Sequence, residues 1–409
     1  MSFLILALSL FFEARAAASV SQFSDQLNQN NLSIQGHGMS EEAEKAKTGY
    51  LGRSFLPSVL LELGQEKFQT GRYKTYGNPY GSLEARFNLF RGGRDRIEAE
   101  FRDIQAKIAG QTKDLAVREE LNKVRKLQWQ IIHNEELIKI LELERKQNES
   151  LKEQANRRAR SGISTKSDIL EFSIYDSEIL ENLESLRHEI VILKIGLSPL
   201  LGISPEKIQF TDVIEHQHDE ELLSSTFSSK GHPRITSLTA ESDLLELQKT
   251  SIKRWWTPSV DVYGGYYLYT LRDRDYLAQD LRDDRVIGVR LTLELFDGLR
   301  SYNQASVVHY QAASKRLMAK HFERQTDASF RILQEDLKYT HEVMHYVESR
   351  IAKSRDYLKV TLQEYDRGVK NSLDALTAMQ RYFRYEKQYL GRKKEYQIIK
   401  ADLLAVLGE

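Results

Sequence analysis

The sequence predicts a mainly α protein with a smaller β part, built from two copies of a β-hairpin followed by a long helical hairpin. Three observations lead to this fold class. The chain has 6 Pro in 409 residues, and its Pro-free stretches are rich in Glu, Lys, Arg, Leu and Gln, as long helices are. Four segments alternate apolar and polar residues with the period of a strand. The second half of the chain also repeats the first at a fixed spacing.

The repeat is visible at two junctions, Phe90–Arg94 and Phe296–Arg300, where a strand pattern runs into a helical one. Phe90 and Phe296 are 206 positions apart. The same offset relates further identical pairs: Gly162 and Gly368, Asp168 and Asp374, Leu170 and Leu376, Lys194 and Lys400, Leu197 and Leu403, and Gly202 and Gly408. A constant offset over about a hundred positions implies two similar helical hairpins, with no insertion in either copy from the first of these pairs to the last.

Composition excludes several classes of function. The formal net charge is +0, so the chain lacks the basic surplus of a nucleic-acid-binding protein, and no nucleic-acid partner is expected. The chain has no Cys, which excludes disulfides, thiolate metal sites and a Cys-anchored lipid. No cofactor and no metal are expected.

The N-terminus is predicted to be a signal peptide, residues 1–18. An apolar run, Phe3–Phe12, precedes an Ala-rich stretch that fits an A-x-A cleavage site, and the run is too short to span a bilayer. No Lys or Arg precedes the run, which leaves open whether the true start lies upstream. The alternative is an apolar N-terminal helix buried in the fold.

The first repeat is expected over residues 19–202 and the second over 232–409, with a polar equatorial segment, 203–231, between them. The expected strands are about 57–68 and 82–90 in the first repeat, and about 258–270 and 285–296 in the second. The expected long helices are about 94–160, 164–201, 300–366 and 371–407. Before the first strand, a short helix is expected to begin behind a Ser40 cap. Pro57 and Pro258 end the helices that precede the strands, because the residue before Pro avoids the helical region.

The strands have the pattern of an outer-membrane barrel: roughly 10 residues each, alternating polarity, long polar loops and flanking aromatics. The alternative is a hairpin packed on a helix in a soluble protein. Four strands cannot close a barrel, because the smallest membrane barrels have about 8. Three chains would supply twelve strands, so we predict a homotrimer. The helices have apolar residues at spacings of three and four, as in coiled coils, and the longest would measure about 100 Å.

These features together resemble the TolC family of outer-membrane efflux proteins, whose junction Leu-Phe-Asp-Gly-x-Arg occurs here at Leu295–Arg300. The resemblance implies a trimer with a 12-strand barrel in the outer membrane of a Gram-negative cell and a 12-helix tunnel in the periplasm. It implies a passive exit duct of a tripartite efflux or type I secretion system, and no enzyme. The implied partners are outer-membrane lipid, a periplasmic adaptor (membrane fusion) protein and an inner-membrane pump of the RND, ABC or a related class.

The resemblance places adaptor docking at the two helical turns, on Gly162, Ile163, Gly368 and Val369. Ser161 and Arg367 stand where the family has Val. A Gly is suited to this position because the residue after a helix often adopts the left-handed conformation. The alternative is that both Gly residues serve only as caps.

The resemblance also implies a closed gate held by polar links between the turns. Tyr365 would form a hydrogen bond with Asp168, and Lys370 would contact Ser167. The family has Arg at the position of Lys370 and Thr at the position of Ser167. Asp374 would form a ring that narrows the entrance and favours cations. The alternative for Asp374 is an acid that stabilises the start of a helix.

Thr377 stands where the family has a second ring acid, so a double acidic ring is not assured.

Elsewhere, His341–His345 fits the H-E-x-x-H pattern of zinc proteases. The pattern lies within a long charged helix and has no counterpart in the first repeat, so we expect no zinc enzyme and no catalytic residue. The rival to a duct is a periplasmic coiled-coil protein without a pore. The transported substrate and the pump class cannot be read from this chain.

Overall fold

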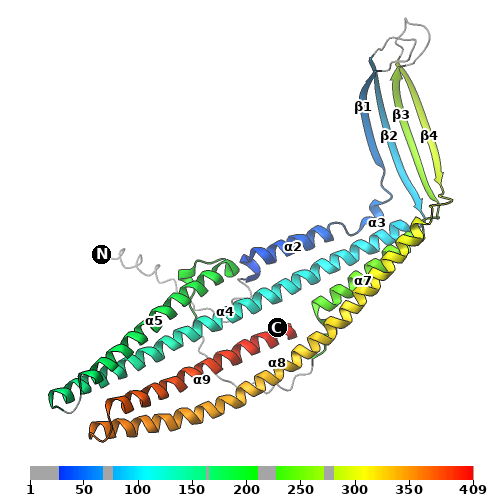
Figure 1. Cartoon of the computed structure of the whole chain (residues 1–409). Helices are drawn as coiled ribbons and strands as arrows, with labels where there is room; N and C mark the ends of the chain where they lie inside the picture. The colour runs from blue at the N-terminus through cyan, green and yellow to red at the C-terminus, as the bar shows by residue number, and fades with distance from the viewer. Residues whose placement is uncertain (1–26, 68–76, 163–164, 211–226, 271–280, 409) are drawn as a thin grey trace, which may run out of the picture. The chain divides into compact units, whose positions relative to one another are not determined.

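The computed structural model describes residues 27–67, 77–162, 165–210, 227–270 and 281–408 (Figure 1). The expected signal peptide, Ile163 and much of the equatorial segment lie outside these residues. The chain divides into two compact units, and each takes segments from both sequence repeats. We call Gly38–Thr112 with Pro233–Phe322 the sheet unit. Met1–His37, Lys113–His232 and Glu323–Glu409 form the tip unit.

The sheet unit contains one antiparallel sheet in the order β1-β2-β3-β4 (Figure 1). Its strands are β1 Ser58–Lys67, β2 Gly77–Arg91, β3 Ser259–Thr270 and β4 Leu281–Thr292. The central pairing of β2 with β3 joins the first repeat to the second. Within the described residues, β1 and β4 each pair on one side only, so both edges of the sheet have unpaired backbone groups.

The register collects apolar side chains on one face of this sheet. Val59 pairs with Ala85, and Ile287 lies at the far end of the same row. Residues that are paired across neighbouring strands lie on the same face of the sheet, so each row of paired residues continues across all four strands. The apolar side chains of this face are Val59, Leu61, Leu63, Leu83, Ala85, Phe87, Val260, Val262, Tyr266, Leu268, Ile287, Val289 and Leu291. Toward the loop end, β4 adds Asp283 and Arg285 to the same rows, opposite Leu268 and Tyr266. Ile287 is 91% exposed, so no described residue of the chain covers this part of the face.

The strand ends differ from those expected. The last strand was predicted over about 285–296, but β4 pairs over Leu281–Thr292. Its ladder stops at Thr292 because the partner, Ser259, is the first residue of β3 and follows Pro258. At the loop end, β2 starts at Gly77 instead of 82, since backbone pairing with β1 continues beyond the alternating pattern.

Helices precede each hairpin: α2 Leu32–Lys45 and α3 Tyr50–Arg53 before β1, and α7 Pro233–Lys253 before β3. The predicted Ser40 cap is wrong, because Ser40 lies inside α2. Asn31 caps this helix instead: its Oδ1 accepts hydrogen bonds from the backbone N–H groups of Ser33 (2.9 Å) and Ile34 (3.1 Å).

The long helices match in length between the repeats. α4 Arg94–Arg160 and α8 Arg300–Asp366 have 67 residues each. The return helices, α5 Lys166–Leu201 and α9 Ser372–Leu407, have 36 each. Both return helices end on a left-handed Gly, at Gly202 and Gly408.

At the start of the long helices, one position distinguishes the repeats. Gly93 has a φ of +74°, and Leu299 at the equivalent place has a φ of +63°. A side chain in this conformation is strained by about 1–2 kcal/mol, so the second junction tolerates a cost that Gly avoids in the first. Asp297 helps to hold the turn, since its Oδ2 accepts a hydrogen bond from the Ser301 backbone N–H at 2.8 Å.

The tip unit has a core cluster to which α4, α5, α8 and α9 all contribute. Its buried members are Leu151, Ala155, Phe172, Leu358, Tyr365, Ala375, Leu376, Ala378, Met379 and Phe383. The two helical hairpins are therefore packed on each other next to their turns. Across the described residues, no helix has an apolar stretch long enough to cross a bilayer.

Candidate functional site

The two helical turns have matching backbone conformations. Gly162 has a φ of +74° and Gly368 a φ of +81°, as a Gly that ends a helix does. The Gly162 N–H donates to the Ala159 carbonyl and the Gly368 N–H to the Tyr365 carbonyl, both at 3.0 Å. The left-handed conformation predicted for both Gly residues is therefore present.

The residues that follow each turn form a capping box. At the start of α5, the backbone N–H of Asp168 donates to Thr165 Oγ1 at 3.3 Å, and Asp168 Oδ2 accepts from the Thr165 N–H at 2.8 Å. At the start of α9, Asp374 and Asn371 make the same pair of bonds, at 2.8 and 3.3 Å. Both acids therefore stabilise a helix start.

Tyr365 is 1% exposed and belongs to the core cluster of the tip unit. Its hydroxyl lies 3.3 Å from Ser372 Oγ, at the first position of α9. This conformation therefore pairs the Tyr365 hydroxyl with Ser372 and not with Asp168. In the second expected pair, Ser167 is exposed, and the Lys370 backbone N–H donates to the Glu364 carbonyl.

Three of the predicted docking positions, Gly162, Gly368 and Val369, are exposed at the turns. Val369 is 72% exposed, and a Cβ at Gly162 would meet no atom within 4 Å. Ile163 lies outside the described residues. An exposed apolar side chain next to a turn without side-chain bulk is a surface on which another protein can pack.

Two interactions of the tip unit were not predicted from the sequence. The guanidinium of Arg158 lies over the Tyr365 ring, 4.3 Å from its centroid, and Nη1 donates to the Tyr365 carbonyl. Arg158 lies three and seven residues after Ala155 and Leu151, which are core residues, so its place on the apolar stripe of α4 was the signal. The other interaction is an ion pair between Glu144 of α4, which is buried, and Lys387 of α9, whose side chain is 32% exposed.

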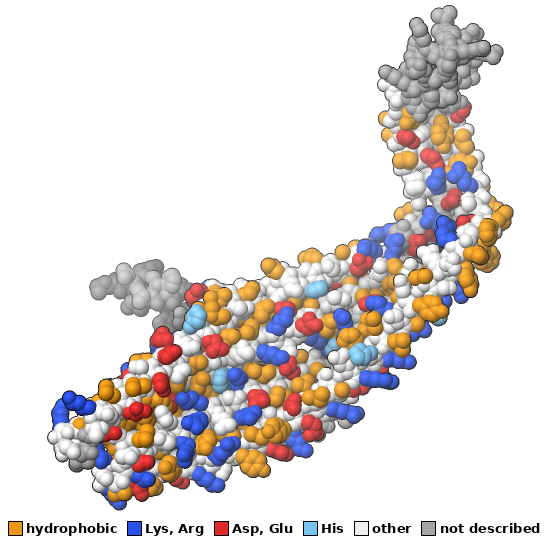
Figure 2. All heavy atoms as spheres, in the orientation of Figure 1, with side chains coloured by type: hydrophobic (Ala, Val, Ile, Leu, Met, Phe, Trp, Pro, Cys, Tyr) orange, Lys and Arg blue, Asp and Glu red, His pale blue; other side chains and the backbone are white. Residues whose placement is uncertain are grey.

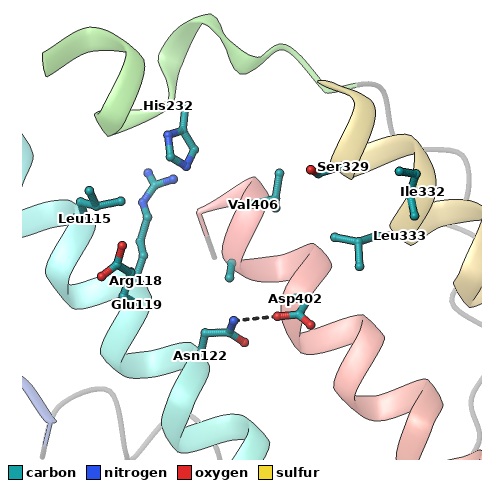
Figure 3. A pocket seen from close by; sticks show the side chains of 11 residues that line it. Leu115, Arg118, Glu119, Asn122, His232, Ser329, Ile332, Leu333, Asp402 and Val406 are labelled. Atoms are coloured by element: carbon teal, nitrogen blue, oxygen red, sulfur yellow. Dashed lines mark hydrogen bonds between the residues drawn. The ribbon is translucent and has the colours of Figure 1, made fainter. Parts of the chain in front are cut away.

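A pocket of about 450 Å³ opens in the tip unit between α4, α8 and α9 (Figure 3). It is lined by Leu115, Arg118, Glu119, Asn122, His232, Ser329, Ile332, Leu333, Asp402, Ala405 and Val406. Asn122 donates to Asp402 Oδ1 at 2.8 Å across it. Burial and the nearby Arg118 lower the pKa of His232, so this ring is neutral at neutral pH. The pocket combines apolar walls with charges of both signs, which selects no single ligand class.

The H-E-x-x-H segment lies within α8. The rings of His341 and His345 stand nearly perpendicular with their centroids 4.9 Å apart, and His345 faces Glu348 at 3.4 Å. Across the part of the chain that the structure describes, no group of three or more His, Asp or Glu side chains is arranged to hold a metal ion.

The surface of the long helices mixes charges with apolar side chains. Figure 2 shows basic and acidic side chains interspersed on the visible face, with apolar patches among them. On α8 several large apolar side chains are exposed, and they recur along the helix: Tyr302, Val307, Tyr310, Leu317, Ile332, Tyr339, Tyr346, Tyr357 and Val360. On α5 the exposed set is Leu170, Ile174, Leu180, Val191, Ile192 and Ile195.

Comparison with known proteins identifies this architecture. Residues 230–409 match the family described as "Outer membrane efflux protein". No curated protein sequence has a significant similarity to the chain. Among solved structures, CusC, described with respect to transmembrane channel formation, is similar at a TM-score of 0.80 and 12% identity, over 95% of this chain and 91% of CusC.

Two further structures have the same fold. The outer membrane protein VceC from Vibrio cholerae is similar at a TM-score of 0.78 and 13% identity, over 95% of this chain and 96% of VceC. The CmeC outer membrane channel of Campylobacter jejuni is similar at 0.79 and 12% identity, over 96% and 86%. The description of the matching family agrees with the outer-membrane location that the sequence predicts. Residues 230–409 thus match the outer membrane efflux protein family, and the chain as a whole has the fold of the solved channel proteins CusC, VceC and CmeC.

Proposed function

We propose that this protein is the outer-membrane exit duct of a tripartite efflux or type I secretion system. Three copies assemble into a barrel of twelve strands and a tunnel of twelve helices, and the duct opens when an adaptor and an inner-membrane pump engage it. The single observation that carries this proposal is a four-stranded sheet with an uncovered apolar face and two unpaired edges, joined directly to helices of 67 residues.

The edges support the assembly. An exposed strand edge is a row of unsatisfied N–H and C=O groups, and in lipid each such group costs several kcal/mol. Pairing β4 of one copy with β1 of the next removes every edge when the ring closes. The apolar face then contacts lipid, and the opposite face, which has Glu84, Arg86, Asp261 and Arg290, lines a polar lumen.

The helices support it as well. In a single copy, apolar side chains along α5 and α8 are exposed, and no other described residue of the same chain covers them. Water-exposed apolar stripes at helical spacing pack against neighbouring helices in coiled coils. Neighbouring copies in a helical tunnel supply these partners along the whole length.

The turns are proposed as the gated periplasmic end. In the closed state, Tyr365 with Asp168 and Lys370 with Ser167 link the two hairpins. The pairing of the Tyr365 hydroxyl with Ser372 is then one of two states of this side chain. Asp374 of three copies forms the ring at the entrance.

Adaptor contact is proposed at Gly162, Ile163, Gly368 and Val369. The exposure of Val369 supports this assignment. The duct catalyses nothing: the pump selects the cargo, and opening is a two-state separation of helices that the partners drive.

The test uses the full chain, extracted from outer membranes in detergent. We expect native mass spectrometry to give a trimer, and planar bilayers to record pores with small closed-state conductance. A monomer that fractionates with soluble periplasmic protein and never conducts would instead support the coiled-coil alternative and end the duct proposal.

A further inference from the structure

We propose that Arg158 is a gate residue, a clasp that joins the end of α4 to the end of α8 and holds the two helical hairpins together at their turns. The inference rests on the proposed duct function. Arg158 is not among the gate residues that the TolC-family resemblance implies. Its role as a clasp follows from the contacts of its own side chain.

The clasp has two contacts on one partner. The Arg158 guanidinium carbon lies 4.3 Å from the centroid of the Tyr365 ring, within the range of a cation–π contact. Nη1 of the same guanidinium donates a hydrogen bond to the Tyr365 backbone carbonyl. Because Tyr365 is buried in the core cluster, both contacts fix Arg158 to a rigid part of the tip unit.

The position of the carbonyl explains why a cation binds there. α8 ends at Asp366, so the Tyr365 carbonyl belongs to the last turn of the helix, where carbonyl groups lack helical partners and the dipole is negative. The Gly368 N–H satisfies this carbonyl once, at 3.0 Å. The Arg158 guanidinium supplies the second bond and the positive charge, from the other hairpin.

The equivalent positions of the two repeats do not form a second clasp from α8 to α4. The residue of α8 equivalent to Arg158 is Glu364, and the residue of α4 equivalent to Tyr365 is Ala159. The duplicated chain therefore makes this link once, between residues 207 positions apart. A movement that parts the end of α4 from the end of α8 has to break both contacts, whatever happens to the hydroxyl of Tyr365.

The clasp does not depend on the Tyr365 hydroxyl, whereas the gate pair of Tyr365 with Asp168 does. The contacts use the ring and the carbonyl of Tyr365, and Tyr365→Phe retains both. Loss of the hydroxyl and loss of the clasp are therefore two different lesions, and their effects on the open fraction should add when both are made.

The test measures conductance of full-length trimers in planar bilayers for Arg158→Gln, with Arg157→Gln as the matched control. Arg157 is the adjacent residue, is exposed, and lies 3.9 Å from Glu153. We expect Arg158→Gln to raise the open fraction by about tenfold, the change expected for one partly desolvated cation–π contact. Arg157→Gln should match the unmodified duct. Arg158→Lys keeps a cation and a donor and should restore most of the closure.

Trimer melting separates a gate role from a role in folding. The melting temperature of Arg158→Gln should equal that of the Arg157→Gln control, because the change affects the turn and not the assembly. If Arg158→Gln does not assemble, Arg158→Met, which retains the apolar stem, is measured in its place.

Two outcomes overturn the clasp and leave the duct standing. One is closure of Arg158→Gln as tight as in the unmodified duct while Tyr365→Phe with Lys370→Ala conducts. The other is equal leakage from Arg157→Gln and Arg158→Gln, which would indicate a general effect of charge. If no variant conducts under any condition, the duct function itself is wrong.

Discussion

The Lys387 ammonium lies 2.7 Å from Oε2 of Glu144, a carboxylate whose side chain is 1% exposed. The other oxygen of Glu144 accepts a hydrogen bond from the Tyr175 hydroxyl, and burial together with this carboxylate raises the pKa of Tyr175. Three helices, α4, α5 and α9, therefore meet at one buried charge. Such a pair contributes little net stability, but removing one partner leaves an uncompensated charge.

We predict that Lys387→Met destabilises the tip unit by about 3 kcal/mol, because Glu144 then stays buried without its cation. The melting temperature of the trimer measures the loss. Lys359→Met is the control, since Lys359 is an exposed lysine of α8. Combining Lys387→Met with Glu144→Gln should recover most of the stability. Equal melting of Lys387→Met and the control would contradict the assignment.

His133 predicts a pH dependence of stability. Burial lowers its pKa from 6.5 to about 4, and the charge of Lys394 acts in the same direction. The unfolded chain therefore binds more protons than the folded one between these two values. Stability should be complete above about pH 6.5 and decrease by up to about 3 kcal/mol as the pH falls toward 4.

Melting at about pH 7.5 and pH 5 tests this prediction. His133→Gln should lose less stability between the two values than the unmodified protein does. His188→Gln, a change of an exposed residue of α5, should behave as the unmodified protein. If all three proteins lose the same amount, His133 is not the group responsible.

For the gate, we expect Tyr365→Phe combined with Lys370→Ala to make the closed duct leak. The first change removes the only hydroxyl that Tyr365 can offer to either partner, and the second removes the proposed link to Ser167. Conductance in planar bilayers is the measurement, with Lys359→Ala as the control for the lost charge. A double variant as tightly closed as the unmodified duct would show that the gate lies elsewhere.

For the entrance, Asp374→Asn should weaken block by polyvalent cations at least tenfold, because three carboxylates leave the ring at once. Asn retains an oxygen that can accept the cap bond from the Asn371 N–H, so α9 should still begin at the same place. Asp366→Asn, at the exposed end of α8, controls for charge near the turns. Unchanged block in Asp374→Asn would leave Asp374 with its helix-start role alone.

The long helices could be predicted from the sequence because their signals are local. Pro-free stretches with apolar residues at helical spacing, ended by Gly162 and Gly368, define them without knowledge of any neighbour. The ends of β4 could not, because a strand continues only as far as its partner does, and β3 begins at Ser259. The start of α2 was misplaced for a different reason: Asn31 caps the helix, but α2 contains Gly36 and Gly38, whose low helix propensity made a helix across them unexpected.

At the turns, the backbone was easier to predict than the side-chain partners. A Gly after a helix indicates the left-handed conformation on its own, and both Gly residues have it. The partner of the Tyr365 hydroxyl depends on how two hairpins pack, which no local pattern encodes. Arg158 was missed for a different reason: a basic residue in the last turn of a helix is already explained by the dipole, so its place on the apolar stripe of α4 was not taken to indicate a contact with the second hairpin.

The equal lengths of α4 and α8, and of α5 and α9, restrict how such a protein can change its reach. Deleting one heptad from α4 alone would withdraw its turn by about 10 Å while the turn after α8 stayed in place. The clasp between Arg158 and Tyr365 would then have no partner. In the proposed duct, an altered distance to the inner-membrane pump therefore requires matched insertions or deletions at four places in the gene, so evolution can adjust this span only in coordinated steps.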